Sequence, residues 1–375
     1  MSRLHLFFPE NDLALASGLD FYTPPPAAAA LHRAGSCLPL WFASCGDSIA
    51  VAERDVAWLN DSADRFGIEA SAYRGLPAGL KPAPWGWSRA ARTAFRRLGF
   101  DNPTMPSDNA LERLRMLSHR RTAIALRNAI EKIMPDARLT PAAEELFTTD
   151  DIAAYLKHEP RTLLKLPWSS SGRGLVAMEP DLQGRMQAQI QGMLRRQGSV
   201  CAEPRLPKRS DFALLYHYGN GRADYRGLSL FHTEGLGAYS GNVLAPQQML
   251  HNHLRRQCHA GTFDNLPLAI GEALGQVLGT DYEGPLGVDM MTLADSDRLA
   301  LVELNLRNTM GHMSMELYAN RIAYGSIGMF SIVPASGRSS CGEAHHRRMT
   351  RGIHYLNPAG HDFDFRVSLK RYSIF

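Results

Sequence analysis

The strongest constraint on this chain is a pair of short apolar segments separated by a polar turn near its C-terminal end. Segments 287–291 and 301–307 flank the turn 294–297, and such a pattern predicts a β-hairpin. Asp289 and Glu303 are equidistant from the centre of the turn. The hairpin therefore places them directly opposite each other, where two side chains point to the same face of the sheet.

Side-chain alternation brings further polar groups to this face, because every second residue of a strand points the same way. Asn305 and Arg307 follow Glu303 in that alternation. Two facing carboxylates repel each other unless a cation lies between them, and oxygen ligands suit Mg²⁺ or Mn²⁺. We interpret Asp289, Glu303 and Asn305 as metal ligands; the alternative is a solvated hairpin face with two incidental acids.

Length and composition set the broad class of protein. The chain has 375 residues, enough for two or three folding units, and a net charge of +4 with a pI near 8.8. This mild basic excess suits an anionic substrate and is too weak to indicate nucleic acid. The five cysteines form no C-x-x-C pair, which favours reduced thiols. With no leader or membrane-spanning run, we expect a soluble, cytoplasmic protein with no membrane partner.

The first 105 residues are expected to form a small α/β unit. Segments 4–8 and 38–42 are predicted to be strands and 49–58 a helix. The polar turn 8–12 follows the first strand directly, and loops at the carboxyl ends of such strands often contact ligands. An Asx-type turn that caps the next helix explains the same residues equally well.

A lysine in an apolar strand, followed by a glycine- and serine-rich loop, is the second notable pattern. A helix capped by Ser107 or Asp108 and continuing past Leu117 precedes it. Lys165 is then either paired with an anion inside the protein or an edge lysine whose charge reaches water. The loop that follows consists of Ser169, Ser170, Ser171, Gly172, Arg173 and Gly174.

This loop offers backbone N–H groups, hydroxyls and one guanidinium to polyphosphate oxygens. It lacks the G-K-[ST] sequence and the following helix of a Walker A loop, since another strand, 175–178, is expected after it. A plain flexible turn is the alternative. A strand lysine, such a loop, a later strand ending at Glu203 and the acidic hairpin together indicate a site for Mg·ATP.

In order and spacing these residues resemble the ATP-grasp superfamily of carboxylate–amine or carboxylate–thiol ligases, over residues 105–315. Segment 161–175 is similar to the family's phosphate-binding lysine and glycine-rich flap, and segment 201–206 to its adenine hinge. Glu303-Leu-Asn305-Leu-Arg307 is similar to the E-x-N-x-R variant of biotin-carboxylase-like members. The resemblance assigns nucleotide contacts to Arg120, Lys165, the loop Ser169–Gly174, Glu203, Leu206 and Asp211, and metal contacts to Asp289, Glu303 and Asn305.

Two departures from the family pattern matter. Arg120 stands where the family carries its first ATP lysine, and Gly287 stands where D-alanine-ligase-like members carry an arginine. An arginine that acts on the reaction intermediate is therefore expected to be Arg307 or Arg226. The glycine-rich stretch 235–242 and the turn 10–12 are further candidates for substrate contact.

The resemblance implies an α/β and α+β protein with two ATP-clamping lobes. We expect an N-terminal α/β substrate-side domain (1–105), a small lobe with the flap (106–200), a large lobe with the metal site (201–335) and a C-terminal tail (336–375). The implied activity is ATP- and Mg²⁺-dependent activation of a carboxylate as an acyl phosphate, which an amine then attacks.

A small-molecule kinase of the same fold and a non-catalytic nucleotide-binding protein are the alternatives. The carboxylate and the amine stay unidentified, and the oligomeric state stays open, with a homodimer among the alternatives.

Overall fold

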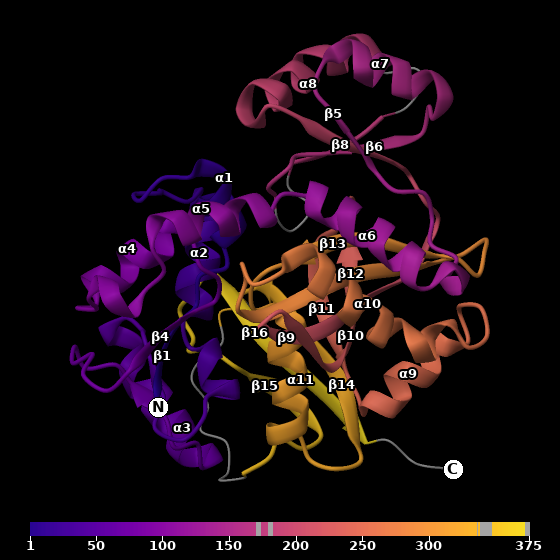
Figure 1. Cartoon of the computed structure of the whole chain (residues 1–375). Helices are drawn as coiled ribbons and strands as arrows, with labels where there is room; N and C mark the ends of the chain where they lie inside the picture. The colour runs from indigo at the N-terminus through magenta and orange to yellow at the C-terminus, as the bar shows by residue number, and fades with distance from the viewer. Residues whose placement is uncertain (170–173, 179–182, 336, 338–346, 372–375) are drawn as a thin grey trace.

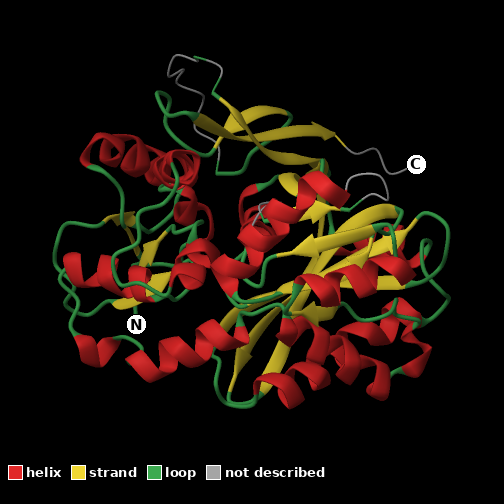
Figure 2. Cartoon of the chain, turned by 90° about the horizontal axis from the view of Figure 1, so that it is seen from above, coloured by secondary structure: helices red, strands yellow, loops and turns green. Residues whose placement is uncertain are grey.

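A computed structural model describes residues 1–169, 174–178, 183–335, 337 and 347–371, which form three β-sheets (Figure 1). The first sheet belongs to the N-terminal domain and is parallel, in the order β3-β2-β1-β4. Helices lie on both sides of it (Figure 2). The strands are β1 (Arg3–Leu6), β2 (Ser48–Ile49), β3 (Ser71–Ala72) and β4 (Lys81–Pro84). The helices are α1 (Asn11–Ser17), α2 (Pro26–Gly35), α3 (Glu53–Phe66) and α4 (Arg89–Arg97), with 3-10 helices η1 (Leu38–Phe42) and η2 (Asn102–Thr104).

Two expectations for this domain are wrong. Segment 38–42 is a buried 3-10 helix instead of a strand. Pro39 lies in its first turn. Its ring fixes the backbone φ angle there, and the N–H that proline lacks would have no partner within the helix at this position. The helix expected over 49–58 begins only at Glu53, because Ile49 pairs with β1. The turn after β1 leads into α1, with Glu10 at the helix N-cap and no side-chain capping bond.

The connection to the next lobe consists of α5 (Asp108–Leu117), α6 (Arg121–Ile133) and η3 (Pro135–Ala137). Ser107 caps α5 as expected, since its hydroxyl accepts a hydrogen bond from the Ala110 N–H. The single long helix we expected is interrupted after Leu117. At the break, the buried His119 ring accepts the Arg121 N–H, and the Arg120 N–H donates to Pro167. The interruption thereby directs Arg120 toward the small lobe.

The small lobe is an antiparallel sheet in the order β5-β8-β6-β7. Its strands are β5 (Glu144–Leu146), β6 (Thr162–Lys165), β7 (Leu175–Ala177) and β8 (Val200–Pro204). Helices α7 (Thr149–His158) and α8 (Gln183–Gln197) cover the outer face of this sheet (Figure 1). Strand β8 pairs with both β5 and β6, so this sheet continues to Pro204, beyond the boundary we had placed at residue 200.

The third sheet is antiparallel and has eight strands, in the order β13-β12-β9-β10-β11-β14-β16-β15. They are β9 (Lys208–Gly219), β10 (Arg222–Glu234), β11 (Ala238–Leu244), β12 (Gly284–Leu293), β13 (Leu299–Asn305), β14 (Ser326–Pro334), β15 (Gly352–Tyr355) and β16 (Phe363–Arg371). Helices α9 (Gln247–Arg255), α10 (Thr262–Leu278) and α11 (Met310–Arg321) accompany it. Residues 352–371 are therefore part of the large sheet, where we expected a separate tail. They also meet the N-terminal domain, since Phe365 packs against Phe7.

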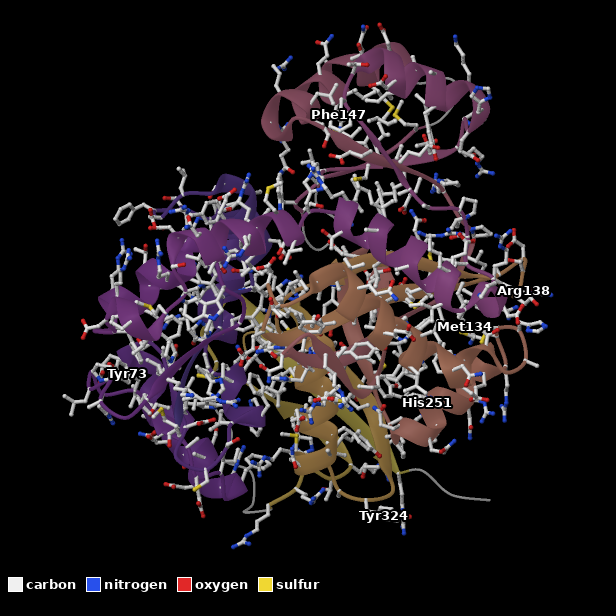
Figure 3. All side chains as sticks on the ribbon, in the orientation of Figure 1. Tyr73, Met134, Arg138, Phe147, His251 and Tyr324 are labelled. Atoms are coloured by element: carbon white, nitrogen blue, oxygen red, sulfur yellow. The ribbon has the colours of Figure 1, made fainter. Side chains whose placement is uncertain are left out.

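The surface carries isolated apolar side chains. Phe147 on the small lobe and Tyr324 below α11 are exposed at opposite ends of the molecule (Figure 3). Single exposed apolar residues are normal on a protein surface and indicate no shared interface. Among the described helices, none combines the length and apolarity that crossing a membrane requires.

The N-terminal domain docks on the large lobe beside the end of β13. The Asn308 N–H donates to the Trp85 carbonyl at 2.8 Å. Gly86 faces the same junction, where an added Cβ would lie 2.6 Å from Asn11 Nδ2 and 2.8 Å from Arg307 Cβ. The lack of a side chain at Gly86 therefore allows the two units to approach this closely.

We expect Gly86→Ala to lower the free energy of unfolding by about 1–3 kcal/mol, because the new methyl group overpacks this junction. Gly192→Ala in α8 is the matched control. Its Cβ would meet nothing closer than the flexible end of Arg196, at 3.6 Å, so the better helix propensity of alanine should stabilise the protein by up to about 1 kcal/mol. Denaturant titration measures both variants. Unchanged stability of Gly86→Ala would contradict the tight junction.

Candidate functional site

A cavity of about 370 Å³ lies where the N-terminal domain, the small lobe and the large lobe meet. The small sheet stands above β12 and β13 of the large sheet (Figure 1). The charged residues on the cavity wall come from every part of the chain: Glu10, Arg120, Lys165, Glu203, Arg205, Lys208, Asp211, Asp289, Glu303 and Arg307. Nearly all the residues that the sequence singled out as nucleotide or metal contacts, where described, therefore line one cavity.

The acidic hairpin has the register that the sequence predicted. Asp289 pairs with Glu303 and Gly287 pairs with Asn305 across β12 and β13. A β-bulge follows Asp289, and bulges commonly re-aim side chains beside functional sites. The Asn305 amide donates to an Asp289 carboxylate oxygen at 2.9 Å. Two carboxylates and the Asn305 amide thus lie together at the edge of the large sheet, with the amide nitrogen toward Asp289 and the amide oxygen toward Arg307.

The two hairpin carboxylates are electrostatically unfavourable as they stand. Burial and the neighbouring charge of Glu303 raise the pKa of Asp289 to about 8, although Arg307 and the Asn305 amide oppose the shift. A divalent cation would remove this repulsion, and the donor set of Asp289, Glu303 and Asn305 suits Mg²⁺. The described residues hold no group of three His, Cys, Asp or Glu side chains placed for a metal. Oxygens of water or of a bound phosphate would complete a metal shell here.

Four cations on the cavity wall are each paired with a carboxylate. Arg120 lies 3.0 Å from Glu303, Lys165 2.5 Å from Glu203, Lys208 2.6 Å from Asp211, and Arg307 2.7 Å from Asp12. Thr233 also donates to Asp211 at 2.7 Å. The cavity therefore carries both signs of charge in close contact.

Arg120 and Lys165 approach the cavity from the connection and from β6. The Arg120 guanidinium donates to the Leu166 carbonyl and to the Ser169 hydroxyl, each at 3.0 Å. Lys165 is only 4% exposed, so it is paired inside the protein and does not extend to water. Ser169 is the first residue of the loop and Gly174 the last. Gly174 has a φ of +70°, which glycine adopts without strain. Ser170, Ser171, Gly172 and Arg173 lie outside the described residues.

A smaller recess of about 40 Å³ adjoins the main cavity and shares Arg120, Lys165, Glu203 and Leu206 with it. Its remaining wall is largely apolar, with Cys201, Met291, Ala300, Leu301 and Val302 among the lining residues. Burial raises the pKa of the Cys201 thiol to about 12, which keeps this thiol neutral. A flat apolar base fits such a recess better than a charged group does.

Arg307 is held by the N-terminal domain. Its Nε and Nη2 atoms donate to both oxygens of Asp12, and Nη2 also donates to Asn305. Burial alone would lower the pKa of Arg307, but the Asp12 carboxylate outweighs burial and raises it, so the guanidinium stays charged. Asp12 was singled out only as part of a turn. No sequence signal links it to Arg307, which is 295 positions away.

Arg226, our other candidate for an arginine at the reaction centre, lies elsewhere. It is exposed and lines a second cavity of about 1580 Å³ with His217 and Glu283, whereas Arg307 lies on the walls of both cavities. The cause is a β-bulge in β10, where Tyr225 and Gly227 pair with consecutive residues of β9 and Arg226 is the extra residue. The structure thus leaves Arg307 as the candidate at the cavity.

Within the glycine-rich stretch 235–242, the structure places Tyr239 and Asn242 on the main cavity. The Tyr239 hydroxyl donates to the Asn242 side chain, whose amide donates to Ser229 at 2.5 Å. Sequence reasoning missed Ser229 and Lys208. Both follow from strand alternation only after the face of β9 and β10 that lines the cavity is known.

Comparison with known proteins identifies the fold. No protein-family model and no curated protein matches the chain in sequence. A solved structure of a biotin carboxylase β,γ-ATP complex from Campylobacter jejuni matches with a TM-score of 0.51 at 13% identity, over 100% of this chain and 88% of that one.

Two further solved structures match less closely. The N5-carboxyaminoimidazole ribonucleotide synthetase of Thermus thermophilus matches with a TM-score of 0.48 at 17% identity, over 98% of this chain and 93% of that one. The biotin carboxylase domain of a Hydrogenobacter thermophilus 2-oxoglutarate carboxylase, in complex with MgADP, matches with a TM-score of 0.49 at 10% identity, over 100% and 86%. The biotin carboxylase likeness shows the fold that the sequence resemblance predicted: the chain has the ATP-grasp fold.

Proposed function

We propose that the protein is an ATP- and Mg²⁺-dependent ligase that activates a carboxylate as an acyl phosphate for attack by an amine. One observation carries the proposal. In an ATP-grasp fold, the facing carboxylates Asp289 and Glu303, with Asn305, share a cavity with the cations Arg120 and Lys165. Solved structures of this fold include complexes with ATP, ADP and MgADP.

The nucleotide would enter between the small and large lobes. Its base would point toward the small recess whose wall includes Leu206, Met291 and Leu301, beside the end of β8. Lys165 and Arg120 would contact the phosphates that extend from the recess into the main cavity. Ser169, at the start of the loop, accepts a hydrogen bond from Arg120, so the described start of the loop lies beside a cation that would contact the phosphates.

Metal and nucleotide binding are coupled in this arrangement. Arg120 is paired with Glu303, so a cation held by Glu303 would release the guanidinium for phosphate. Phosphate at Arg120 likewise frees Glu303 for the metal. Mg²⁺ held by Asp289, Glu303 and Asn305 would neutralise phosphate charge. Each ligand therefore lowers the cost of binding the other.

The reacting carboxylate would lie near Arg307. The described contacts of Arg307 use four of its five N–H groups, including one from Nη1 to the Asn308 carbonyl. The remaining N–H and the fixed charge are available to the phosphoryl group in transfer. Because Asp12 holds the guanidinium in place, this stabilisation needs little reorganisation during the reaction.

Hydroxylamine trapping tests the proposed reaction directly. With ATP, Mg²⁺ and a panel of carboxylic acids, a ligase of this type converts its own substrate to a hydroxamate, because hydroxylamine captures the acyl phosphate. The variant Glu303→Gln should give none while keeping its fold by circular dichroism. A product that is a stable phosphate ester, with no hydroxamate, would identify a small-molecule kinase instead. Undiminished turnover by the variant would contradict the metal assignment.

Lys165→Ala should weaken ATP binding by about 1.5–3 kcal/mol, because it removes a charge-assisted hydrogen bond in a desolvated site. Lys132→Ala removes the same charge from the exposed end of α6 and is the control. Calorimetry gives both affinities. Equal ATP affinities of the two variants would show that Lys165 does not contact the nucleotide.

Mg²⁺ affinity in the presence of ADP should rise roughly tenfold between pH 7 and pH 9. The pKa of Asp289 is near 8 without metal, so below pH 8 the metal must displace a proton. Phosphate groups titrate near pH 6 and add little to this range. Calorimetry in buffers of different ionisation enthalpy should detect nearly one released proton per site at pH 7. An affinity independent of pH from 7 to 9 would rule out Asp289 as a proton-coupled ligand.

A further inference from the structure

The wall that the N-terminal domain contributes to the main cavity is apolar except at one residue. Its lining residues are Pro9, Glu10, Leu13, Ala28, Leu31 and Trp85. Glu10 is thus the only charged side chain that this wall carries among the described residues. The phosphate-binding cations and the metal-binding acids come from the connection and the two ATP-grasp lobes. This wall is therefore distinct in chemistry from the nucleotide side of the cavity.

Glu10 is buried in this wall, and one of its carboxylate oxygens accepts no hydrogen bond from the described residues. The residue is only 3% exposed, and its Oε1 atom lies 2.7 Å from His32 Nδ1. The His32 ring is itself held by edge-on contacts with Phe7 and Phe8. The other oxygen, Oε2, is buried and has no hydrogen-bond partner in the described part of the chain. A buried carboxylate oxygen without a donor is costly, so the position favours a ligand that supplies one.

The position of Glu10 links this oxygen to the reaction centre. Glu10 precedes α1, and Asp12, two residues later, holds Arg307 through both carboxylate oxygens. Any group bound at Glu10 is therefore kept next to the chain segment that fixes Arg307. A carboxylate ligand would be repelled there, whereas an amine would be attracted.

We propose that Glu10 binds the amino group of the attacking substrate, and that this substrate is a primary amine with an apolar group beside its nitrogen. The inference rests on the proposed ligase function and names the chemical class of its amine. The Glu10 carboxylate accepts an N–H of the amine, while Leu13, Leu31 and Trp85 contact the apolar group. Tyr239 and Asn242, which also line the cavity, offer further polar contacts.

Two probes that differ only in the amino group test this site. L-Leucinamide carries an amine beside an apolar side chain, and 4-methylpentanamide is the same molecule without the amino group. Ligand-observed NMR titrations with the full-length protein, with and without MgADP, give the two affinities. The site predicts that leucinamide binds at least about tenfold more tightly than the deaminated probe. This comparison on the natural sequence needs no variant.

The variant Glu10→Gln keeps the size of the side chain and removes its charge. It should erase the preference for leucinamide and leave the affinity for 4-methylpentanamide and for MgADP unchanged. Glu272→Gln, on the exposed side of α10, is the charge-matched control and should keep the preference. Rescue of the preference by Glu10→Asp would support recognition by the carboxylate.

Equal binding of both probes by the natural protein, or binding of neither, overturns the Glu10 site. An equal loss of both probes in Glu10→Gln also overturns it, because a merely structural Glu10–His32 pair would weaken both alike. Failure of MgADP to bind the natural protein counts instead against the proposed ligase function. The probe titrations therefore test the Glu10 site, and the MgADP titration tests the proposed ligase function separately.

Discussion

Repulsion between Asp289 and Glu303 is the interaction on which the rest of the cavity depends. The hairpin register forces the two carboxylates onto one face, and the fold compensates with positive charge from outside the hairpin. Arg120 reaches Glu303 from the connection between domains. Arg307 lowers the cost of ionising Asp289 and is itself fixed by Asp12 of the N-terminal domain. The repulsion between these two carboxylates is thus offset by charges that the interdomain connection and the N-terminal domain hold in place.

The same compensation explains why the cavity suits a large anion with a metal. The Arg120–Glu303 pair can be exchanged for a cation–phosphate and a metal–carboxylate contact without leaving either charge unpaired. This exchange avoids the penalty that normally attends breaking a buried ion pair. It also makes the two ligands interdependent, so that neither is expected to bind strongly alone.

Local patterns in the sequence predicted the parts of the site that depend on local geometry. The hairpin register follows from side-chain alternation and one turn, and the start of α5 follows from Ser107. Segment 38–42 was misassigned because a short apolar run has no period that separates strand from helix. At the break before Arg121, the Arg121 N–H donates to the His119 ring, and the Arg120 N–H donates to Pro167. The contact with Pro167 is a tertiary one, which no local pattern reveals.

The bulge at Arg226 and the contact between Asp12 and Arg307 also could not be predicted from local sequence patterns. The bulge at Arg226 interrupts the pairing of β10 with β9, and no local pattern in the sequence marks it. The hydrogen bonds between Asp12 and Arg307 join residues 295 positions apart. Neither surrounding segment contains a sequence pattern that predicts this contact. That the N-terminal domain positions Arg307 of the large lobe can therefore be seen only in the folded structure.

The most direct test of the central claim is calorimetry of ATP binding, with and without Mg²⁺, for the natural protein and for Glu303→Gln. If the hairpin acids hold the metal and release Arg120 to the phosphates, ATP binds the natural protein much more tightly with Mg²⁺, and the variant loses this dependence. ATP binding that is absent from both proteins, or equally Mg²⁺-dependent in both, would contradict the account.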